Sequence, residues 1–410
     1  MTRRTLHEYT STIMEISDED RVRLLTDTGK KLTITPTLSP DTFEINPNQF
    51  VGVVRLQSGL TLDLLPKVPL FNVMWMIAEV ERLEKMDFNR LENEVTISTF
   101  DDILEPIATA FVDEVEHLLA RGLYRAYIEQ EDNLSTVRGR IDFQEDLNRN
   151  LILRHRTYCR FTEYSWDIPE NQVIRQVIRQ LARWGFSKKL SRRLVALDRQ
   201  MEDIRLTNMR ASDVLRFNYS RQSEHYRPVH RFCHLFLDGF SLSEGAGNSP
   251  FDGFLIDMNT LFERFVAIKL RQALTSLSSD FRVLAQHHTK LFAEIGMEIK
   301  PDILLQRGST TMFAADTKYK KRNSEAGASA DYYQMIAYCT VYGLQHGWIL
   351  YPRHLENIHR QLSVIGSDII IHETSIDLRE SREFIWTEFL TLADQFVAQS
   401  GITSLASLAS

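Results

Sequence analysis

The chain reads PDILLQRGSTTMFAADTK from Pro301 to Lys318. Two apolar runs in this stretch, Ile303-Leu304-Leu305 and Met312-Phe313-Ala314-Ala315, are separated by the polar segment Arg307-Gly308-Ser309. Short apolar runs bounded by a glycine-containing polar segment are typical of two strands joined by a turn. The stretch therefore predicts a pair of adjacent strands near the middle of the C-terminal part of the chain.

Two acids and a lysine flank these strands. Asp316 and Lys318 are two residues apart on one strand, so their side chains share a face. Pairing of the strands would bring Asp302 near Asp316. Neighbouring carboxylates repel each other unless a cation compensates, and Mg²⁺ prefers carboxylate and water oxygens. Asp302 and Asp316 are therefore candidate ligands for Mg²⁺ or Mn²⁺, and Lys318 is a candidate for stabilising charge on a phosphate. The alternative is a surface hairpin with ordinary charges.

The helices on either side of this stretch supply three further candidates. Glu263 lies in a predicted helix and is either a metal ligand, directly or through water, or a solvated charge. Gln334 and Tyr338 are four residues apart and share one helix face. Gln334 could contact a phosphate or a metal-bound water, whereas Tyr338 either forms a hydrogen bond beside it or packs in the core.

A short basic run follows the lysine. Lys320, Lys321 and Arg322 are candidates for contacts with a DNA backbone. A charge run of this length is also typical of a solvated loop.

Composition places the chain among folded proteins with more than one domain. It has 410 residues, of which 43% are hydrophobic and 25% charged, and a net charge of −7. The acidic balance confines any nucleic-acid contact to a local patch. No apolar run approaches the ~20 residues that span a bilayer, and the N-terminus lacks a signal-peptide pattern. Three distant cysteines favour reduced thiols and a cytoplasmic location.

The pattern of strands and helices predicts an α/β chain (α+β overall) in three parts. Residues 1–100 are β-rich, with hairpins at 22–34 and 50–65 and then a helix at 70–83. Residues 101–250 are mainly helical, with helices at 170–184, 190–203 and 225–238, a projecting hairpin near 127–143 and a linker at 241–250. Residues 251–410 mix strands at 303–305, 312–315, 348–351 and 368–376 with helices at 332–342 and 379–399.

The candidate residues together resemble the PD-(D/E)xK nuclease superfamily, in its branch with a Gln-x-x-x-Tyr motif. More narrowly, the chain is similar to the McrC family, the nuclease subunits of McrBC 5-methylcytosine-dependent restriction systems. The segments that carry this resemblance are Leu64-Leu65-Pro66-Lys67-Val68, Val137-Arg138-Gly139-Arg140-Ile141-Asp142-Phe143, Pro169-Glu170-Asn171-Gln172-Val173-Ile174, Ala315-Asp316-Thr317-Lys318-Tyr319 and Ile349-Leu350-Tyr351-Pro352. The family usually has alanine where this chain has Thr317.

The resemblance implies a fold, an activity and a partner. It implies a restriction-endonuclease-like domain over residues 251–410 that cleaves DNA with Mg²⁺, in defence against viruses. The metal ligands would be Glu263, Asp302, Asp316 and the backbone carbonyl of Thr317. It also implies that the N-terminal region binds an McrB-like AAA+ GTPase ring and stimulates GTP hydrolysis. A homodimer is compatible with cutting both strands.

The chain itself has no Gly-x-x-x-x-Gly-Lys-Ser/Thr loop, so we expect it to bind no nucleotide. Arg138, Gly139 and Arg140 are candidates for the contact with the ring. Their alternative role is structural, with a glycine required by a tight hairpin and two solvated arginines.

Two rival functions stay open at this point. The first is a non-catalytic adaptor that activates and bridges GTPase rings, although the intact acids and lysine argue against lost catalysis. The second is a stand-alone DNA repair nuclease of the RecB type, although the long N-terminal half argues against it.

Overall fold

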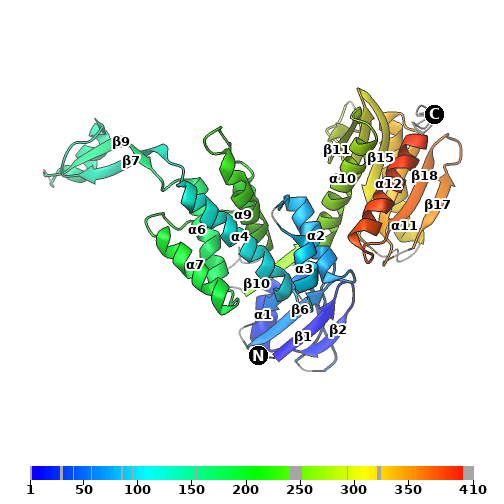
Figure 1. The fold of residues 1–410 in the computed structure, drawn as a ribbon, viewed down its shortest axis with the longest axis horizontal. Helices are drawn as coiled ribbons and strands as arrows, with labels where there is room; N and C mark the ends of the chain where they lie inside the picture. The colour runs from blue at the N-terminus through cyan, green and yellow to red at the C-terminus, as the bar shows by residue number, and fades with distance from the viewer. Residues whose placement is uncertain are drawn as a thin grey trace. The chain divides into compact units, whose positions relative to one another are not determined.

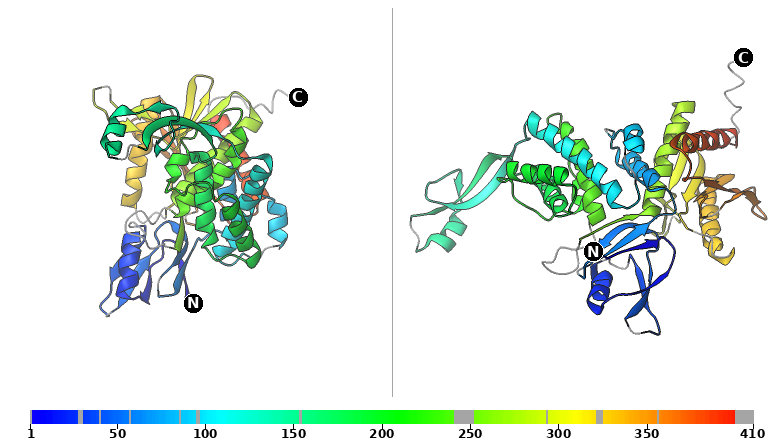
Figure 2. Two further views of the ribbon diagram at one scale, coloured as in Figure 1. Left: turned by 90° about the vertical axis from the view of Figure 1, so that its left-hand side faces the viewer. Right: turned by 60° about the horizontal axis from the view of Figure 1, so that its bottom comes forward.

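The computed structural model describes residues 2–27, 31–39, 41–56, 58–84, 86–94, 97–152, 155–240, 252–292, 294–320, 325–355 and 357–399 (Figures 1 and 2). The chain divides into two units. Unit 1 joins Met1–Ile103 to Leu242–Ser410, and unit 2 is Leu104–Ser241. The linker predicted at 241–250 lies outside the described residues.

An N-terminal sheet of four strands includes one strand from the C-terminal half of the chain. Its order is β1 (Thr2–His7), β6 (Leu60–Leu65), β5 (Phe50–Arg55) and β10 (Asp252–Asp257). The hairpin predicted at 50–65 is confirmed as β5 and β6, which pair antiparallel. Strand β10 pairs antiparallel with the other edge of β5. The C-terminal half is therefore built onto the N-terminal sheet by backbone hydrogen bonds.

The strand predicted at 22–25 is wrong, because these residues belong to helix α1 (Asp18–Asp27). Ser17 caps this helix by accepting a hydrogen bond from the Asp20 N–H at 3.1 Å, and its first turn is acidic, which suits a helix N-terminus. The predicted partner segment forms β3 (Thr33–Pro36), which pairs instead with β4 (Thr42–Asn46). Strand β2 (Thr12–Glu15) lies on the other side of β4.

The helix predicted at 70–83 is confirmed as α2 (Leu70–Glu81), which ends at Arg82 in the left-handed conformation. It packs against α10 (Met258–Leu277) through an edge-to-face contact between Trp75 and Phe265, whose ring centroids are 5.0 Å apart. A short helix, α3 (Phe88–Glu94), follows α2. Helix α10, which carries Glu263, is thus held from the N-terminal part of unit 1.

Unit 2 is mainly helical, as predicted. Its elements are the greater part of α4 (Asp101–Arg121), α6 (Pro169–Ala182), α7 (Lys188–Gln200), α8 (Ala211–Val214), the 3-10 helix η1 (Glu224–Tyr226) and α9 (Arg227–Phe240), with a sheet of three strands. The three predicted helices correspond to α6, α7 and η1 with α9. Figure 1 shows β7 and β9 of that sheet extending away from α6 and α7 of the same unit.

The hairpin predicted near 127–143 is wrong in its pairing. Strand β7 (Ala126–Leu134) pairs along its length with β9 (Thr157–Ser165), and β8 (Arg140–Ile141) pairs with β9 as well. Helix α5 (Phe143–Asn150) lies between β8 and β9 in the chain. The central strand therefore comes from residues beyond the predicted hairpin, which local alternation could not reveal.

A six-stranded sheet forms the C-terminal part of unit 1. Its order is β11 (Phe281–Ala285), β14 (Ile303–Arg307), β15 (Thr310–Thr317), β16 (His346–Pro352), β18 (Ile370–Ile376) and β17 (His359–Ser363). A separate small ribbon is formed by β12 (Thr289–Lys290) and β13 (Glu298–Ile299). The four strands predicted in this region are confirmed within β14, β15, β16 and β18.

Helices cover both faces of this sheet (Figure 2). Residues of α11 (Glu325–Tyr342) pack in one core with Ala314 of β15. The neighbouring residue Phe313 points to the opposite face and contacts Phe396 of α12 (Arg382–Gln399), with ring centroids 4.1 Å apart. The continuous apolar run on β15 therefore matches two buried faces, as in a strand covered by helices on both sides.

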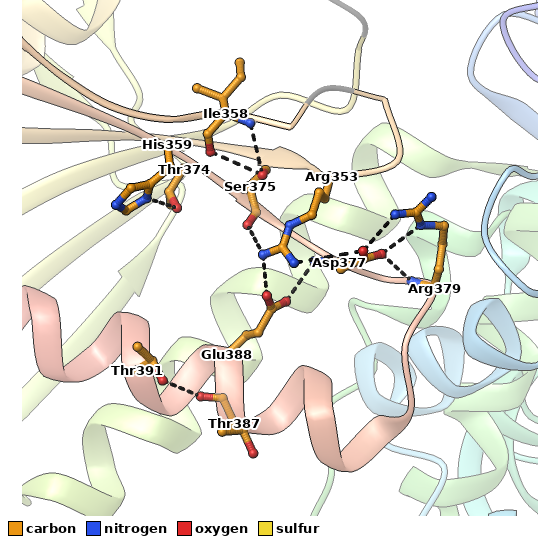
Figure 3. Close-up of polar contacts among 10 residues, drawn as sticks. All are labelled: Arg353, Ile358, His359, Thr374, Ser375, Asp377, Arg379, Thr387, Glu388 and Thr391. Atoms are coloured by element: carbon orange, nitrogen blue, oxygen red, sulfur yellow. Dashed lines mark hydrogen bonds and ion pairs between the residues drawn. The ribbon is translucent and has the colours of Figure 1, made fainter.

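An ion-pair group fixes α12 to the sheet at the end of β16 (Figure 3). Arg353 forms an ion pair with Glu388 of α12 and donates to the carbonyl of Ser375 at 3.1 Å. The other oxygen of Glu388 accepts from the Asp377 N–H at 2.8 Å. Arg379, beside Asp377, holds the pKa of that carboxyl below its usual value. The segment after β16 is thereby fixed in place.

Two composition-based expectations have structural counterparts. The cysteines Cys159, Cys233 and Cys339 are free and buried. Within the part of the chain that the structure describes, no helix combines the length and apolar character needed to cross a membrane.

Candidate active site

Strands β14 and β15 bring the two predicted aspartates together. They pair antiparallel with Ile303 opposite Ala315, which places Asp302 beside the end of β15. The Oδ2 atom of Asp302 accepts two hydrogen bonds from Thr317, one from the backbone N–H at 2.7 Å and one from the hydroxyl at 2.8 Å. The predicted proximity of the two strand ends is therefore present.

Asp316 is the most deeply buried acid of this group, with 3% of its surface exposed. Burial, and next the negative charge of Asp302, raise the pKa of Asp316 to about 7. An acid in this environment holds its proton more tightly than usual, and it loses that proton more readily when a cation lies nearby. The charge of Asp316 at neutral pH therefore depends on whether a cation lies beside it.

Lys318 is the cation closest to this acid. Its Nζ atom forms an ion pair with Asp316 and lies 3.6 Å from a carboxylate oxygen of Asp331. Burial alone would lower the pKa of Lys318, but the charge of Asp316 and the other nearby acids outweighs it, so the pKa is raised. Lys318 therefore stays protonated while it is partly buried.

Gln334 and Tyr338 continue a chain of hydrogen bonds from the lysine. The Nζ of Lys318 donates to Oε1 of Gln334 at 3.0 Å, and Nε2 of Gln334 donates to the Tyr338 hydroxyl at 2.6 Å. The Tyr338 hydroxyl in turn donates to the carbonyl of Lys300 at 3.0 Å. Tyr338 is also a core residue with 2% exposure. It therefore both packs in the core and forms a hydrogen bond with Gln334.

Glu263 belongs to the same electrostatic group. Burial raises the pKa of its carboxyl, and the charge of Asp302 raises it further. Its Oε1 atom accepts a hydrogen bond from Nε2 of Gln286 at 2.5 Å. Glu263 is therefore half-buried and paired with Gln286, and its role as a metal ligand stays a prediction.

Gln286 is a site residue that the sequence alone did not indicate. It follows β11 and has a φ of 51°, in the left-handed region that residues other than glycine rarely adopt. Its backbone N–H donates to the carbonyl of Asp302 at 2.9 Å. The residue thus connects Glu263 to Asp302, and only the β11–β14 pairing makes this visible.

Asp331 is the second residue that sequence reasoning missed. It is buried, and Nζ of Lys320 lies 2.9 Å from one of its oxygens. The three-residue spacing between Asp331 and Gln334 on one helix was the available signal. Lys320 is therefore partly neutralised, while Lys321 and Arg322 lie outside the described residues.

The donors of this group suit a hard cation, since all are oxygens from Glu263, Asp302, Asp316 and the carbonyl of Thr317. The described residues nonetheless contain no group of three or more His, Cys, Asp and Glu side chains at metal-binding distances. Protein donors hold the acids instead: Thr317 for Asp302, Lys318 for Asp316 and Gln286 for Glu263. The residues fit Mg²⁺ by chemistry, and the structure shows them in contact with their own protein partners.

The residues predicted to contact a partner lie in unit 2. Arg138 forms an ion pair with Glu163 at 3.4 Å and stacks over Phe161, with its guanidinium carbon 4.4 Å from the ring centroid. Gly139 has a φ of 72°, and a Cβ there would lie 2.4 Å from the carbonyl oxygen of Arg160. Arg140 is exposed. The glycine is therefore required by its positive φ and its close approach to β9, not by a tight hairpin, and the contact of the two arginines with a partner stays a prediction.

Comparison with known proteins gives a family match and several structural likenesses, including two to McrBC assemblies. No curated protein matches the chain. A half-complex from the tetradecameric assembly of Thermococcus gammatolerans McrB AAA+ hexamers with bound McrC has a similar chain, with a TM-score of 0.57 and 17% identity, covering 95% of this chain and 99% of that one. The cryo-EM structure of the Thermococcus gammatolerans McrBC complex gives a TM-score of 0.43 and 20% identity, covering 67% and 88%. The first likeness shows a common fold.

The family match covers all five segments that carry the resemblance. The family described as McrBC 5-methylcytosine restriction system component matches residues 45–352, which is more than half of the chain. This range includes Asp302, Asp316 and Lys318, and it also includes the Arg138–Arg140 segment. The resemblance stated from the motifs is confirmed at the level of the family. The chain belongs to the family of McrBC 5-methylcytosine restriction system components.

Proposed function

We propose that this chain is the DNA-cleaving subunit of an McrBC-type restriction system, a Mg²⁺-dependent endonuclease that works with a partner AAA+ GTPase ring. Family membership supports the restriction system. The observation that carries cleavage is the meeting of Asp302, Asp316 and Lys318 at the adjoining ends of β14 and β15. The fold is of the restriction-endonuclease type in this proposal, with the C-terminal sheet as its core.

Four oxygen donors would hold the metal in this function. They are the carboxylates of Glu263, Asp302 and Asp316 and the carbonyl of Thr317. Bound Mg²⁺, or Mn²⁺ in its place, supplies a Lewis acid for a phosphate oxygen and lowers the pKa of water. Burial of Asp316 and its closeness to Asp302 make a cation favourable here, because two carboxylates in a buried site repel each other.

The role of Lys318 follows from its contacts. Its ammonium stays charged because Asp316 and Asp331 lie close to it. Gln334 accepts one of its hydrogens, which fixes the direction of the side chain. A fixed cation beside the acids can stabilise negative charge that develops on a phosphate during hydrolysis. Tyr338 positions Gln334 by accepting its amide hydrogen.

DNA contact would continue along the segment after the lysine. Within the basic run, the structure describes Lys320, which pairs with Asp331. Asp331 also lies near Lys318, so Lys320 and Lys318 share this acid. Lys321 and Arg322 complete the run in sequence. A cut in both strands would require two such sites, which a homodimer supplies.

The partner in this proposal is a GTPase ring of the McrB kind. The structurally similar chain is McrC bound to McrB AAA+ hexamers in its own assembly. Arg138 and Arg140, on either side of Gly139, are the residues that we assign to the contact with the ring. The sequence contains no phosphate-binding loop of its own, so GTP would be bound by the ring.

The test is copurification with the candidate ring, followed by incubation of methylated and unmethylated DNA with GTP and Mg²⁺. We expect methylation-dependent cleavage by the wild-type chain and none by Asp316→Ala. Stimulated GTP hydrolysis without cleavage by wild type would favour the non-catalytic adaptor. Cleavage that needs neither ring nor GTP would favour a stand-alone repair nuclease.

A further inference from the structure

Glu8, directly after β1, is a buried carboxylate that the proposed chemistry does not use. Its exposed fraction is 0%. Its Oε1 atom accepts hydrogen bonds from the Lys67 N–H at 2.8 Å and from the Tyr319 hydroxyl at 2.9 Å. Its Oε2 atom is buried and has no hydrogen-bond partner among the described residues. Burial of an incompletely paired carboxylate destabilises the fold, so this residue needs an explanation.

Tyr319 connects this carboxylate to the nuclease motif, because it directly follows Lys318. Its ring packs on Phe262, with centroids 5.6 Å apart, and Phe262 directly precedes Glu263. Its backbone carbonyl accepts a hydrogen bond from the hydroxyl of Tyr9. The Tyr9 hydroxyl also lies 3.1 Å from Oδ1 of Asn259 on α10. The segment Glu8-Tyr9 therefore contacts both the β15 end and α10.

His354 closes the group from the segment after β16. Its Nε2 atom lies 3.3 Å from the Tyr319 hydroxyl and 3.7 Å from Oε1 of Glu8. Its neighbour Arg353 is anchored to α12 and to β18 (Figure 3). Lys318 is also connected to β16, since its backbone N–H donates to the carbonyl of Leu350 at 2.9 Å. Tyr319 is thus fixed from several directions.

Segments that are far apart in the sequence meet at this point. Lys67 belongs to the Leu-Leu-Pro-Lys-Val segment, Tyr319 to the Asp-Thr-Lys-Tyr segment, and His354 follows the Leu-Tyr-Pro segment. None of these contacts reaches the oxygens proposed to hold the metal. They converge on Tyr319, through its hydroxyl and its carbonyl, and Tyr319 directly follows the lysine whose ammonium pairs with Asp316.

From these contacts we infer that Glu8, Tyr9 and Tyr319 are positioning residues for the nuclease site, and that the N-terminal strand is a working part of that site. This rests on the proposed nuclease function. Glu8 holds the side chain of Tyr319 and Tyr9 holds its carbonyl, so the two contacts fix both the side chain and the backbone of the residue that follows Lys318. A displacement of about 1 Å at a catalytic group can cost roughly a hundredfold in rate.

The test compares single hydroxyl deletions in the full chain with its partner ring. Tyr319→Phe and Tyr9→Phe keep their rings and lose only the hydroxyl, with its contacts to Glu8 and His354 in the first case and to the Tyr319 carbonyl and Asn259 in the second. We expect kcat for DNA cleavage to fall roughly tenfold to a hundredfold, while KM for DNA stays within about twofold of wild type. Glu8→Gln, which retains an acceptor oxygen, should keep more activity than Glu8→Ala.

Two controls separate positioning from general stability. Tyr226→Phe removes a hydroxyl of comparable burial, which donates to Asn171 at 2.7 Å in unit 2. Its Tm should change about as much as that of Tyr319→Phe, with kcat unchanged. The increase in Tm caused by Mg²⁺ alone should persist in Tyr319→Phe, because the metal-binding oxygens are untouched.

The outcomes distinguish the inference from the function it rests on. Wild-type kcat in Tyr319→Phe and Tyr9→Phe, with Asp316→Ala inactive, overturns positioning and leaves the nuclease standing. Equal losses of kcat in Tyr226→Phe and Tyr319→Phe also overturn it, since stability alone would then explain the effect. An inactive wild-type chain in the presence of the ring, GTP and Mg²⁺ overturns both.

Discussion

Asp302 accepts both the backbone N–H and the hydroxyl of Thr317 on a single oxygen, Oδ2, at 2.7 and 2.8 Å. The McrC resemblance has alanine at the position of Thr317, and alanine would supply only the N–H. The extra hydroxyl therefore competes for a carboxylate that we propose as a metal ligand. The threonine in place of alanine therefore adds a hydrogen bond to the carboxylate of Asp302.

Thr317→Ala should keep cleavage and reduce the Mg²⁺ requirement. Loss of one hydrogen bond of about 1 kcal/mol from the carboxylate corresponds to at most about a fivefold fall in the Mg²⁺ concentration for half-maximal cleavage. The measurement is a Mg²⁺ titration of the cleavage rate. Thr317→Ser retains the hydroxyl and serves as the matched control, with wild-type behaviour expected. A higher Mg²⁺ requirement in Thr317→Ala would show that the hydroxyl orients Asp302 for the metal.

Asp316→Asn should abolish cleavage and stabilise the metal-free protein at neutral pH. The pKa of Asp316 is raised to about 7 from an ordinary 3.8. Between these values the folded state binds a proton that the unfolded state lacks, so the stability of the wild-type protein falls as pH rises through this window. Asparagine removes that dependence, while Asp331 and Gln334 still pair with Lys318.

Thermal unfolding in a chelator at pH 5 and pH 8 measures this effect. The Asp316→Asn variant should exceed wild type at pH 8 by about 2–4 °C or more in Tm, and the two should converge towards pH 4. A Tm for Asp316→Asn below wild type at pH 8 would contradict the raised pKa.

Cleavage should depend on the metal in a way that reflects the oxygen ligands. Mg²⁺ and Mn²⁺ should support turnover, and a chelator in excess should stop it. Ca²⁺ should bind and raise the Tm yet support little cleavage, because it is larger and accepts looser geometry. Rates are measured on linear DNA with each cation in turn. Undiminished cutting in excess chelator would remove metal-dependent chemistry from the proposal.

The sequence predicted strands and helices best where one element carried its own signal. The apolar runs at 303–305 and 312–315 became β14 and β15 because both faces of these strands are covered. The segment at 22–25 failed because a cap at Ser17 and an acidic first turn outweighed its apolar run. The pairing of β7 with β9 depends on residues more than twenty positions apart, which no local pattern contains.

The candidate site shows the same division. Asp302, Asp316 and Lys318 could be proposed from spacing, since two-residue periodicity on a strand fixes their faces. Gln286 and Glu8 could not, because each reaches the site through tertiary contacts: Gln286 beside β14, and Glu8 from the first strand of the chain. The pairing of β10 with β5 likewise joins residues about two hundred positions apart.

This pairing also changes what is expected of a truncated chain. A fragment beginning at residue 251 would lose the β5 partner of β10 and the Glu8 and Tyr9 contacts to Tyr319. Experiments on the site therefore need the full chain.

Arg140→Ala should reduce the stimulation of GTP hydrolysis by the partner ring without affecting the fold. Arg140 is exposed on β8, and arginine's planar fork suits an oriented contact with carboxylates or phosphates. Arg138 has its own contacts with Glu163 and Phe161, so Arg138→Ala removes packing as well as charge. The single Arg140 variant is therefore the cleaner test of the partner contact.

The assay measures GTP turnover of the purified ring with increasing amounts of each variant. Arg140→Ala should lower the stimulated rate at least about tenfold, the loss expected for a charged contact of about 1.5–3 kcal/mol. Arg216→Ala removes an arginine of high exposure from unit 2, outside the β7–β9–β8 sheet, and should stimulate like wild type. Asp302→Ala should also stimulate normally while losing cleavage, because its contacts lie within unit 1. Full stimulation by Arg140→Ala would exclude this arginine from the contact and leave the nuclease proposal unchanged, since the two activities use different residues.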